Sequence, residues 1–168
     1  FYPMDYMYTI YDVLYRAMSA TYQTKNIMDH IRQMNDLYMD FRTGREREFQ
    51  YATQAYTGAV LGVPGIGKTS TVQRCLSLMP QVIVHTNYGG KPMYTKQINY
   101  LFVECPSDCS VRTLAFNIFS AIDRAIGSDY LKQATYQRAV AASATTTKLK
   151  IICMNHHIGL IVIDEIQN

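Results

Sequence analysis

The chain has 168 residues, of which 48% are hydrophobic and 17% charged. This balance is typical of one folded domain and excludes a disordered or acidic tail protein. No stretch approaches the roughly 18 consecutive apolar residues of a transmembrane helix, so we expect no membrane span. The four cysteines form no CxxC pair, which favours reduced thiols in a cytoplasmic protein over disulfides or zinc ligands.

The net charge of +3 is too small to predict nucleic-acid binding by itself. Residues 1–56 hold six basic and seven acidic side chains, whereas residues 57–168 hold ten and six. The later part is therefore the better candidate for contact with an anion. The chain starts at Phe1 with no basic and apolar leader, and we expect it to be a piece of a longer protein, cut at both ends.

Residues 1–56 are expected to form an N-terminal helical segment. They contain nine of the 14 tyrosines and six of the nine methionines. Ile27, Ile31, Met34 and Tyr38 recur at steps of three and four residues, which indicates one amphipathic helix face. Such a face is most often packing surface. Use of these adaptable side chains to bind a partner is the alternative.

From residue 57 onward, short apolar runs alternate with segments of helical spacing. The expected strands are 57–63, 82–85, 100–104 and 160–163, and the expected helices are 68–79, 110–126 and most of 130–157. We expect the second and third strands to pair as a hairpin, the last strand to be buried on both faces, and a helix break at 145–147. The alternation predicts an α/β fold with helices on both sides of a parallel sheet.

The strongest motif spans residues 62–69 and fits G-x-x-x-x-G-K-[ST] at every position. An apolar run precedes it and a helical pattern follows, as a phosphate-binding loop (Walker A) requires. Glycines allow successive backbone N–H groups to point inward, where they and the helix start hold phosphate oxygens. The candidate phosphate-binding residues are Gly62, Val63, Pro64, Gly65, Ile66, Gly67, Lys68, Thr69 and Ser70.

Two side chains of this loop have specific expected roles. Lys68 would place its ammonium between the β- and γ-phosphates, so we count it among the catalytic residues. The hydroxyl of Thr69 would be a ligand of Mg²⁺.

A second motif follows the last expected strand. Asp164 and Glu165 come directly after four aliphatic residues, which is the Walker B form. Ligands of open α/β sheets lie beyond the carboxyl ends of the strands, so Asp164 could approach a Mg²⁺ ion held by Thr69. Glu165 could deprotonate the attacking water. This pair of carboxylates favours ATP with Mg²⁺ as the substrate complex, and no guanine-reading Asn-Lys-x-Asp motif is present.

Four segments together resemble a known family. Beside the loop at 62–70, these are 80–85, 103–108 and 158–168, where Glu-Cys-Pro-x-Asp and Asp-Glu-Ile-Gln-Asn are the distinctive parts. Walker A and B alone indicate only a P-loop ATPase of the ASCE class. With the other segments, residues 57–168 resemble the AAA+ ATPases of the TnsC/TniB type, which regulate DNA transposition.

The resemblance implies a three-layer P-loop sandwich over 57–168 whose core is incomplete, because sensor 1, the arginine finger and the helical lid would follow Asn168. It also implies an ATP-dependent homo-oligomer, a ring or filament, that assembles on duplex DNA. Such an assembly would carry a signal from a target-selection protein to the transposase. In AAA+ assemblies a neighbouring subunit supplies the arginine finger, so we expect little ATP turnover from this chain alone.

Three basic residues, Lys91, Lys96 and Arg112, are candidate contacts to the DNA phosphate backbone. They lie in the expected hairpin turn and at the start of the next helix, and a solvated turn is the simpler alternative. Two other functions remain open. One is a signalling ATPase of the STAND/NACHT sort that uses nucleotide as a latch, and the other is a different AAA+ loader acting on DNA.

Overall fold

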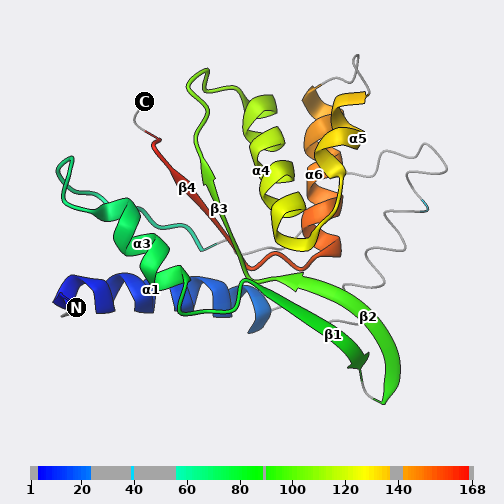
Figure 1. Ribbon diagram of the computed structural model, residues 1–168, viewed down its shortest axis with the longest axis horizontal. Helices are drawn as coiled ribbons and strands as arrows, with labels where there is room; N and C mark the ends of the chain where they lie inside the picture. Colours follow the sequence, from blue (N-terminus) through cyan, green and yellow to red (C-terminus); the bar gives the residue numbers. More distant parts are fainter. Residues whose placement is uncertain (1–3, 24–38, 40–55, 89, 137–141, 167–168) are drawn as a thin grey trace.

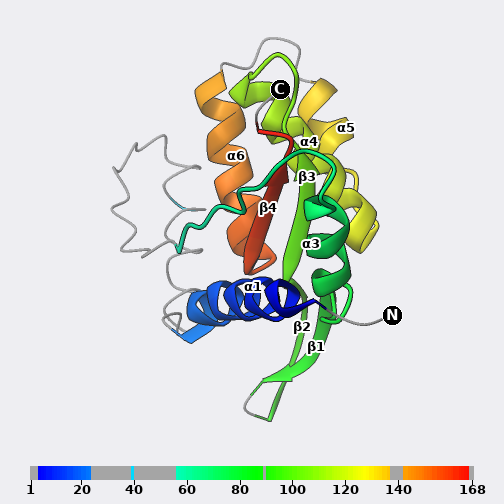
Figure 2. The same cartoon turned by 90° about the vertical axis from the view of Figure 1, so that its left-hand side faces the viewer.

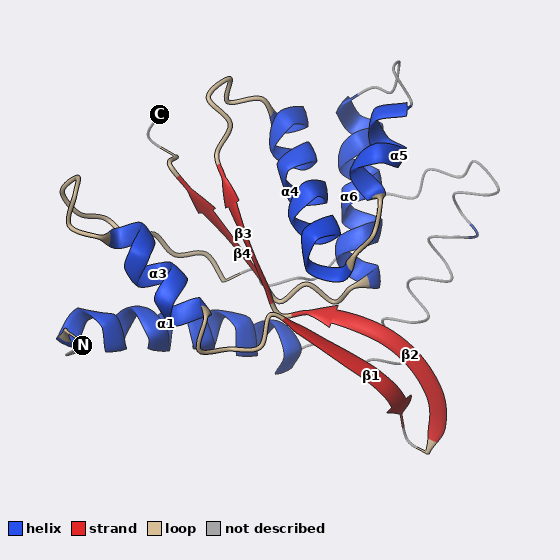
Figure 3. Cartoon of the chain, in the orientation of Figure 1, coloured by secondary structure: helices blue, strands red, loops and turns tan. Residues whose placement is uncertain are grey.

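The computed structural model describes residues 4–23, 39, 56–88, 90–136 and 142–166 (Figures 1 and 3). The helix face expected at Ile27, Ile31, Met34 and Tyr38 lies outside these residues. The helices are α1 (Asp5–Gln23), α3 (Lys68–Leu76), α4 (Val111–Ile126), α5 (Tyr130–Tyr136) and α6 (Ala142–Asn155). The strands are β1 (Val82–Tyr88), β2 (Lys91–Ile98), β3 (Tyr100–Glu104) and β4 (Leu160–Asp164).

The centre of the fold is a parallel pair of strands, β3 and β4, in which Tyr100 lies opposite Leu160 and Glu104 opposite Asp164. Successive side chains of a strand point to opposite faces of the sheet. Leu101 and Val103 accordingly pack in the cluster formed with α4 and α6. Tyr100 and Phe102 pack in the cluster formed with α1 and α3 (Figure 2). The expected α/β arrangement, with helices on both faces of a parallel sheet, is present in this part of the chain.

Helix α1 is amphipathic and crosses the sheet near the start of β4 (Figure 2). Leu14 and Met18 bury their side chains against α3. At the end of α1, the Thr21 hydroxyl donates a hydrogen bond to the Gly159 carbonyl at 2.9 Å, and the Tyr22 hydroxyl donates to the His157 carbonyl at 2.9 Å. These two bonds tie the N-terminal helix to the turn that leads into β4.

The hairpin expectation was wrong about the partner. Residues 82–88 pair antiparallel with β2, with Tyr88 opposite Lys91 and Val82 opposite Ile98. Because only two residues separate the paired ends, the chain turns back at once, and 100–104 is left to pair with β4. The β1–β2 hairpin is a second sheet that projects from the rest of the chain (Figure 1).

The strand expected at 57–63 is also absent from the described structure. These residues are irregular, and the side chains of Leu61 and Val63 are 90% and 67% exposed. An apolar run forms a stable strand only when a neighbouring strand satisfies its backbone, and no described strand pairs with this segment. The expected single parallel sheet is therefore two sheets of two strands each.

Three smaller expectations also differ from the structure. Strand β4 is half-buried along its length rather than buried on both faces, because among the described strands only β3 pairs with it. Residues 145–147 lie inside α6 and do not break it, and the buried Thr145 packs there. Helix α3 ends at Leu76 rather than at residue 79, although Met79 is buried.

The long helix α4 has a capping residue at each end. Gly127 ends it with a left-handed φ of 71°, and its N–H donates to the Asp123 carbonyl. At the start, the cap is Ser110, whose hydroxyl accepts a hydrogen bond from the Thr113 N–H. The Asp108 carboxylate accepts hydrogen bonds from the Ser110 N–H at 3.0 Å and from the Thr113 hydroxyl at 2.8 Å, and these two bonds lower the pKa of the carboxyl group.

Candidate phosphate-binding and magnesium site

The loop at 62–69 reverses direction through two glycines with left-handed backbone angles, Gly65 at φ 80° and Gly67 at φ 86°. Residues with a Cβ atom rarely adopt these angles. Helix α3 then begins at Lys68, and its first hydrogen bond runs from the Thr71 N–H to the Gly67 carbonyl at 2.9 Å. The backbone of the loop therefore turns at two of its three glycines, Gly65 and Gly67.

The N-terminus of α3 is available to an anion. Gly67 occupies the cap position and supplies no side-chain hydrogen bond to the first turn. The first N–H groups of a helix have no partner within the helix, and the helix dipole places partial positive charge there. The first turn of α3 also contains no acidic side chain. A phosphate group suits both the donors and the charge at this position.

The Lys68 ammonium lies over the same loop. Its Nζ atom donates hydrogen bonds to the carbonyl oxygens of Gly62 at 2.9 Å and Val63 at 3.1 Å. The side chain is solvent-accessible, so the charge is not locked in a buried ion pair. The positive charge of the Lys68 ammonium therefore lies beside the loop that leads into the first turn of α3.

The contact that joins the two motifs is a hydrogen bond between Thr69 and Asp164. The Thr69 hydroxyl donates to a carboxylate oxygen of Asp164 at 2.8 Å, across 95 residues of sequence. A hydroxyl and a carboxylate are both hard oxygen ligands of the kind that Mg²⁺ prefers. The donor set therefore fits a magnesium ion bound between α3 and the end of β4.

Glu165 follows Asp164 in a left-handed conformation, with φ 57°. Non-glycine residues in this region carry backbone strain and are often found at functional sites. Beside it, the Cys105 N–H donates to the Asp164 carbonyl at 2.8 Å and extends the pairing of β3 with β4 by one residue. The end of the strand is thus held firmly up to Asp164, and the backbone turns sharply at Glu165.

The three candidate DNA-binding residues come from two elements, Lys91 and Lys96 from β2 and Arg112 from α4. The Lys96 ammonium donates to the Ile126 carbonyl at the end of α4, at 2.7 Å. The Arg112 guanidinium lies 5.4 Å from the centre of the Phe116 ring on its own helix. The Lys91 side chain lies outside what the structure describes. Lys96 therefore has a structural partner, since a cation at a helix C-terminus interacts favourably with the helix dipole.

Sequence reasoning missed the contacts that hold the base of β4. A Cβ atom added to Gly159 would lie 2.5 Å from the Tyr22 hydroxyl and 2.7 Å from the Asn99 carbonyl. A side chain at position 159 would clash with α1 and with the residue before β3, so this position requires glycine. The sequence signal was the glycine immediately before the aliphatic run, which indicates a strand start but not what packs against it.

The other side chains considered as ligands are dispersed. Cys75, Cys105, Cys109 and Cys153 are not joined in disulfides. Over the described ranges, no three His, Cys, Asp or Glu residues lie close enough to hold a metal ion together.

His156, at the end of α6, places Nε2 2.8 Å from the Tyr130 hydroxyl and Nδ1 3.1 Å from the Lys96 carbonyl. Burial lowers the pKa of its imidazole. In the helices that the structure describes, no segment has the length and apolar character needed to cross a bilayer.

Comparison with known proteins gives one family. A search of curated proteins found no match. A family model described as "AAA domain" matches residues 51–168, which is more than half of the chain and includes both motifs. Its range contains α3, β4 and every residue of the site described above. The chain therefore belongs to the AAA family of nucleotide-binding ATPase domains.

Proposed function

We propose that this chain binds ATP with Mg²⁺ in the 62–70 loop and hydrolyses it. The observation that carries the proposal is the hydrogen bond from Thr69 to Asp164, which brings the helix after the loop to the end of β4. The uncapped start of α3 and the Lys68 ammonium add donors and positive charge on the same side.

Each residue of the site has a distinct role in this proposal. The loop N–H groups and Lys68 bind the β- and γ-phosphates, and Thr69 and Asp164 hold Mg²⁺. When bound, Mg²⁺ offsets the charge of the triphosphate and of the adjacent carboxylates. Glu165 orients a water molecule and accepts its proton, and the strained turn at this residue re-aims its side chain after the strand ends.

The direct test is a pair of substitutions that separate binding from chemistry. Lys68→Ala is expected to weaken ATP binding at least about tenfold, because it removes the cation facing the phosphates. Glu165→Gln is expected to keep ATP binding and to lower hydrolysis by about 10²-fold or more, because the amide cannot accept a proton. Equal hydrolysis by the Glu165→Gln and unmodified proteins would contradict the assigned base.

We further propose that the whole protein is a regulator of DNA transposition of the TnsC/TniB type. The segments at 103–108 and 158–168 support this, because they extend the resemblance beyond the two Walker motifs. In this role the protein assembles as a homo-oligomer on duplex DNA and links a target-selection protein to the transposase. Lys91, Lys96 and Arg112 are its candidate DNA contacts, although Lys96 would have to release the Ile126 carbonyl to make one.

Two measurements on the full-length protein test this assignment. Duplex DNA should stimulate ATP hydrolysis, and the transposase should bind the ATP-loaded form. DNA that leaves the rate unchanged would favour a nucleotide latch of the STAND/NACHT sort. Stimulation by DNA without transposase binding would favour another AAA+ loader.

If replacing Lys91 and Lys96 with Gln changes neither DNA affinity nor its salt dependence, these residues are not phosphate contacts.

A further inference from the structure

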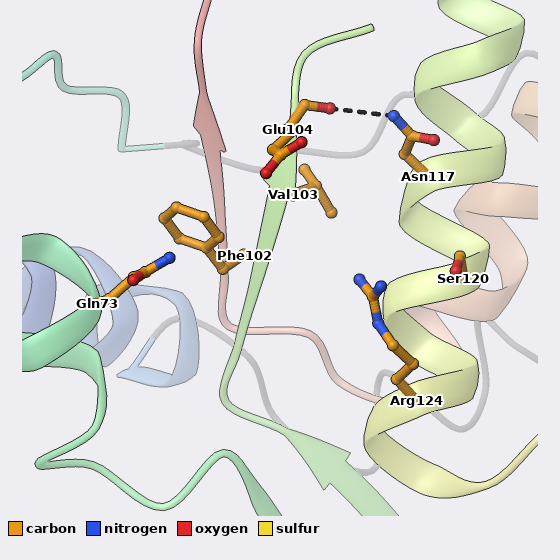
Figure 4. A pocket seen from close by; sticks show the side chains of 7 residues that line it. All are labelled: Gln73, Phe102, Val103, Glu104, Asn117, Ser120 and Arg124. Carbon is orange, nitrogen blue, oxygen red and sulfur yellow. Dashed lines mark hydrogen bonds between the residues drawn. The ribbon is translucent and has the colours of Figure 1, made fainter. Parts of the chain in front are cut away.

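A groove lies on the side of β3 that faces away from β4 (Figure 4). It encloses about 290 Å³ and is lined by α3, β3 and α4. Gln73 comes from α3, and Asn117, Ser120 and Arg124 come from successive turns of α4. The groove is separate from the Thr69–Asp164 site, which involves the other strand of this sheet.

The floor of the groove is the open edge of a strand. The Cys105 N–H points toward β4, where it donates to the Asp164 carbonyl. Backbone groups of a strand alternate in direction, so those of Phe102 and Glu104 point the other way, into the groove. Among the described residues, no hydrogen-bond partner is found for the backbone N–H and C=O of Phe102 or for the N–H of Glu104.

Side chains already bind this edge at both of its ends. The Asn117 amide donates to the Glu104 carbonyl at 3.1 Å, as the N–H of an added strand would. At the other end, the Gln81 amide reaches the Tyr100 carbonyl at 3.5 Å, and the Gln81 carbonyl accepts from the Asn99 N–H. The edge left open is therefore short, and an extended segment of two or three residues would fill it.

The walls of the groove favour an acidic side chain on that segment. Arg124 lines the groove, and in the described part of the chain its guanidinium forms no ion pair and no hydrogen bond. Apart from Glu104, at the end of the strand, the other polar lining side chains are uncharged. A carboxylate beside Arg124 would find a charged donor with paired N–H groups, whereas a cation there would be repelled.

We propose that this groove binds an extended acidic peptide of a partner protein, which adds to the outer edge of β3. The peptide backbone pairs with Phe102 and Glu104, and one of its carboxylates binds Arg124. Backbone pairing supplies affinity and the Arg124 contact supplies selectivity, as in other interactions by strand addition. This inference concerns a different face from the nucleotide site and does not depend on the proposed ATPase reaction.

The test uses a fluorescein-labelled peptide, Thr-Val-Asp-Val-Thr, with blocked ends and the full-length protein. Saturable binding is expected, and a matched peptide with Lys in place of Asp should bind at least about fivefold more weakly. Arg124→Gln should remove this preference, and Arg124→Glu should reverse it in favour of the Lys peptide. Lys132→Gln removes a cation from exposed α5 and is the control that should change nothing.

Two further measurements address the backbone contact. A peptide N-methylated at alternate residues loses the donors that strand pairing needs, and it should bind at least about tenfold more weakly. Ser120→Trp should fill the groove and abolish binding, while an unchanged urea unfolding transition shows that the variant is folded. Binding that is indifferent to both N-methylation and Arg124, or the absence of saturable binding up to about 5 mM peptide, would overturn the proposal.

Discussion

At the scale of single residues, the contact between Thr69 and Asp164 is the most informative feature of the site. Thr69→Val has nearly the same shape but cannot donate to Asp164 or bind a cation. We expect the Mg²⁺ concentration needed for half-maximal ATP hydrolysis to rise by about 10- to 100-fold, as when other metal-site contacts are removed. Thr69→Ser keeps the hydroxyl and should stay within about threefold of the original. A Val variant with an unchanged Mg²⁺ requirement would exclude Thr69 as a ligand.

The two glycines that define the motif, Gly62 and Gly67, differ in the backbone conformation that they adopt. Gly67→Ala places a Cβ atom at φ 86° and is expected to lower the free energy of unfolding by about 1–2 kcal/mol. Gly62→Ala is the matched control, because its Cβ would meet the Lys68 side chain at an ordinary 3.5 Å. Urea unfolding of both variants measures the difference. Equal losses of stability would mean that backbone strain at Gly67 is not the cause.

At the scale of elements, His156 joins β2, α5 and α6 through its two ring nitrogens. Burial is the main cause that lowers the pKa of His156 below its ordinary value of about 6.5, and the charge of Lys96 acts in the same direction. The Lys96 carbonyl partly opposes this, and Tyr130 is the other polar neighbour of the ring. The folded chain therefore favours neutral His156 more than the unfolded chain does.

The sign of the pH effect follows from this difference. Below about pH 6.5 the unfolded chain binds the proton more readily, so stability is full above that pH and falls as the pH decreases toward the folded pKa. His156→Gln should unfold more easily at pH 7.5 and should lose less stability than the original chain between pH 7 and pH 5. Urea unfolding across this range tests it. Parallel stability curves for the two proteins would show that His156 does not titrate with folding.

The elements that could be predicted from the sequence are those whose signals are local in the chain. Helix α4 was predictable because its apolar spacing is a local signal, and the glycine pattern of residues 62–67 matches the observed turn. The pairing of 100–104 with β4 was missed, because the sequence does not say which of two nearby runs turns back at Gly90. The docking of Tyr22 beside Gly159 joins segments 137 residues apart and left no local signal.

At the scale of the whole molecule, the exposed apolar residues Val60 and Leu61 lie directly before the phosphate-binding loop. The side chain of Leu61 becomes buried only if another strand or protein surface covers it. The conformation of the residues that lead into the loop therefore depends on contacts beyond those that the described structure makes. The proposed assembly, in which a neighbouring subunit completes each site, would make catalysis depend on association in a similar way.

This dependence gives a prediction for the full-length protein. ATP hydrolysed per mole of protein should rise with protein concentration over a roughly hundredfold range, and duplex DNA should shift the rise to lower concentration. Added Glu165→Gln protein, which keeps its own surfaces, should support hydrolysis by limiting amounts of unmodified protein if neighbours complete the site in trans. The 168-residue chain alone should bind ATP weakly and turn it over slowly. A constant specific activity at every concentration, or rapid hydrolysis by the isolated chain as a monomer, would mean that one subunit holds the complete site.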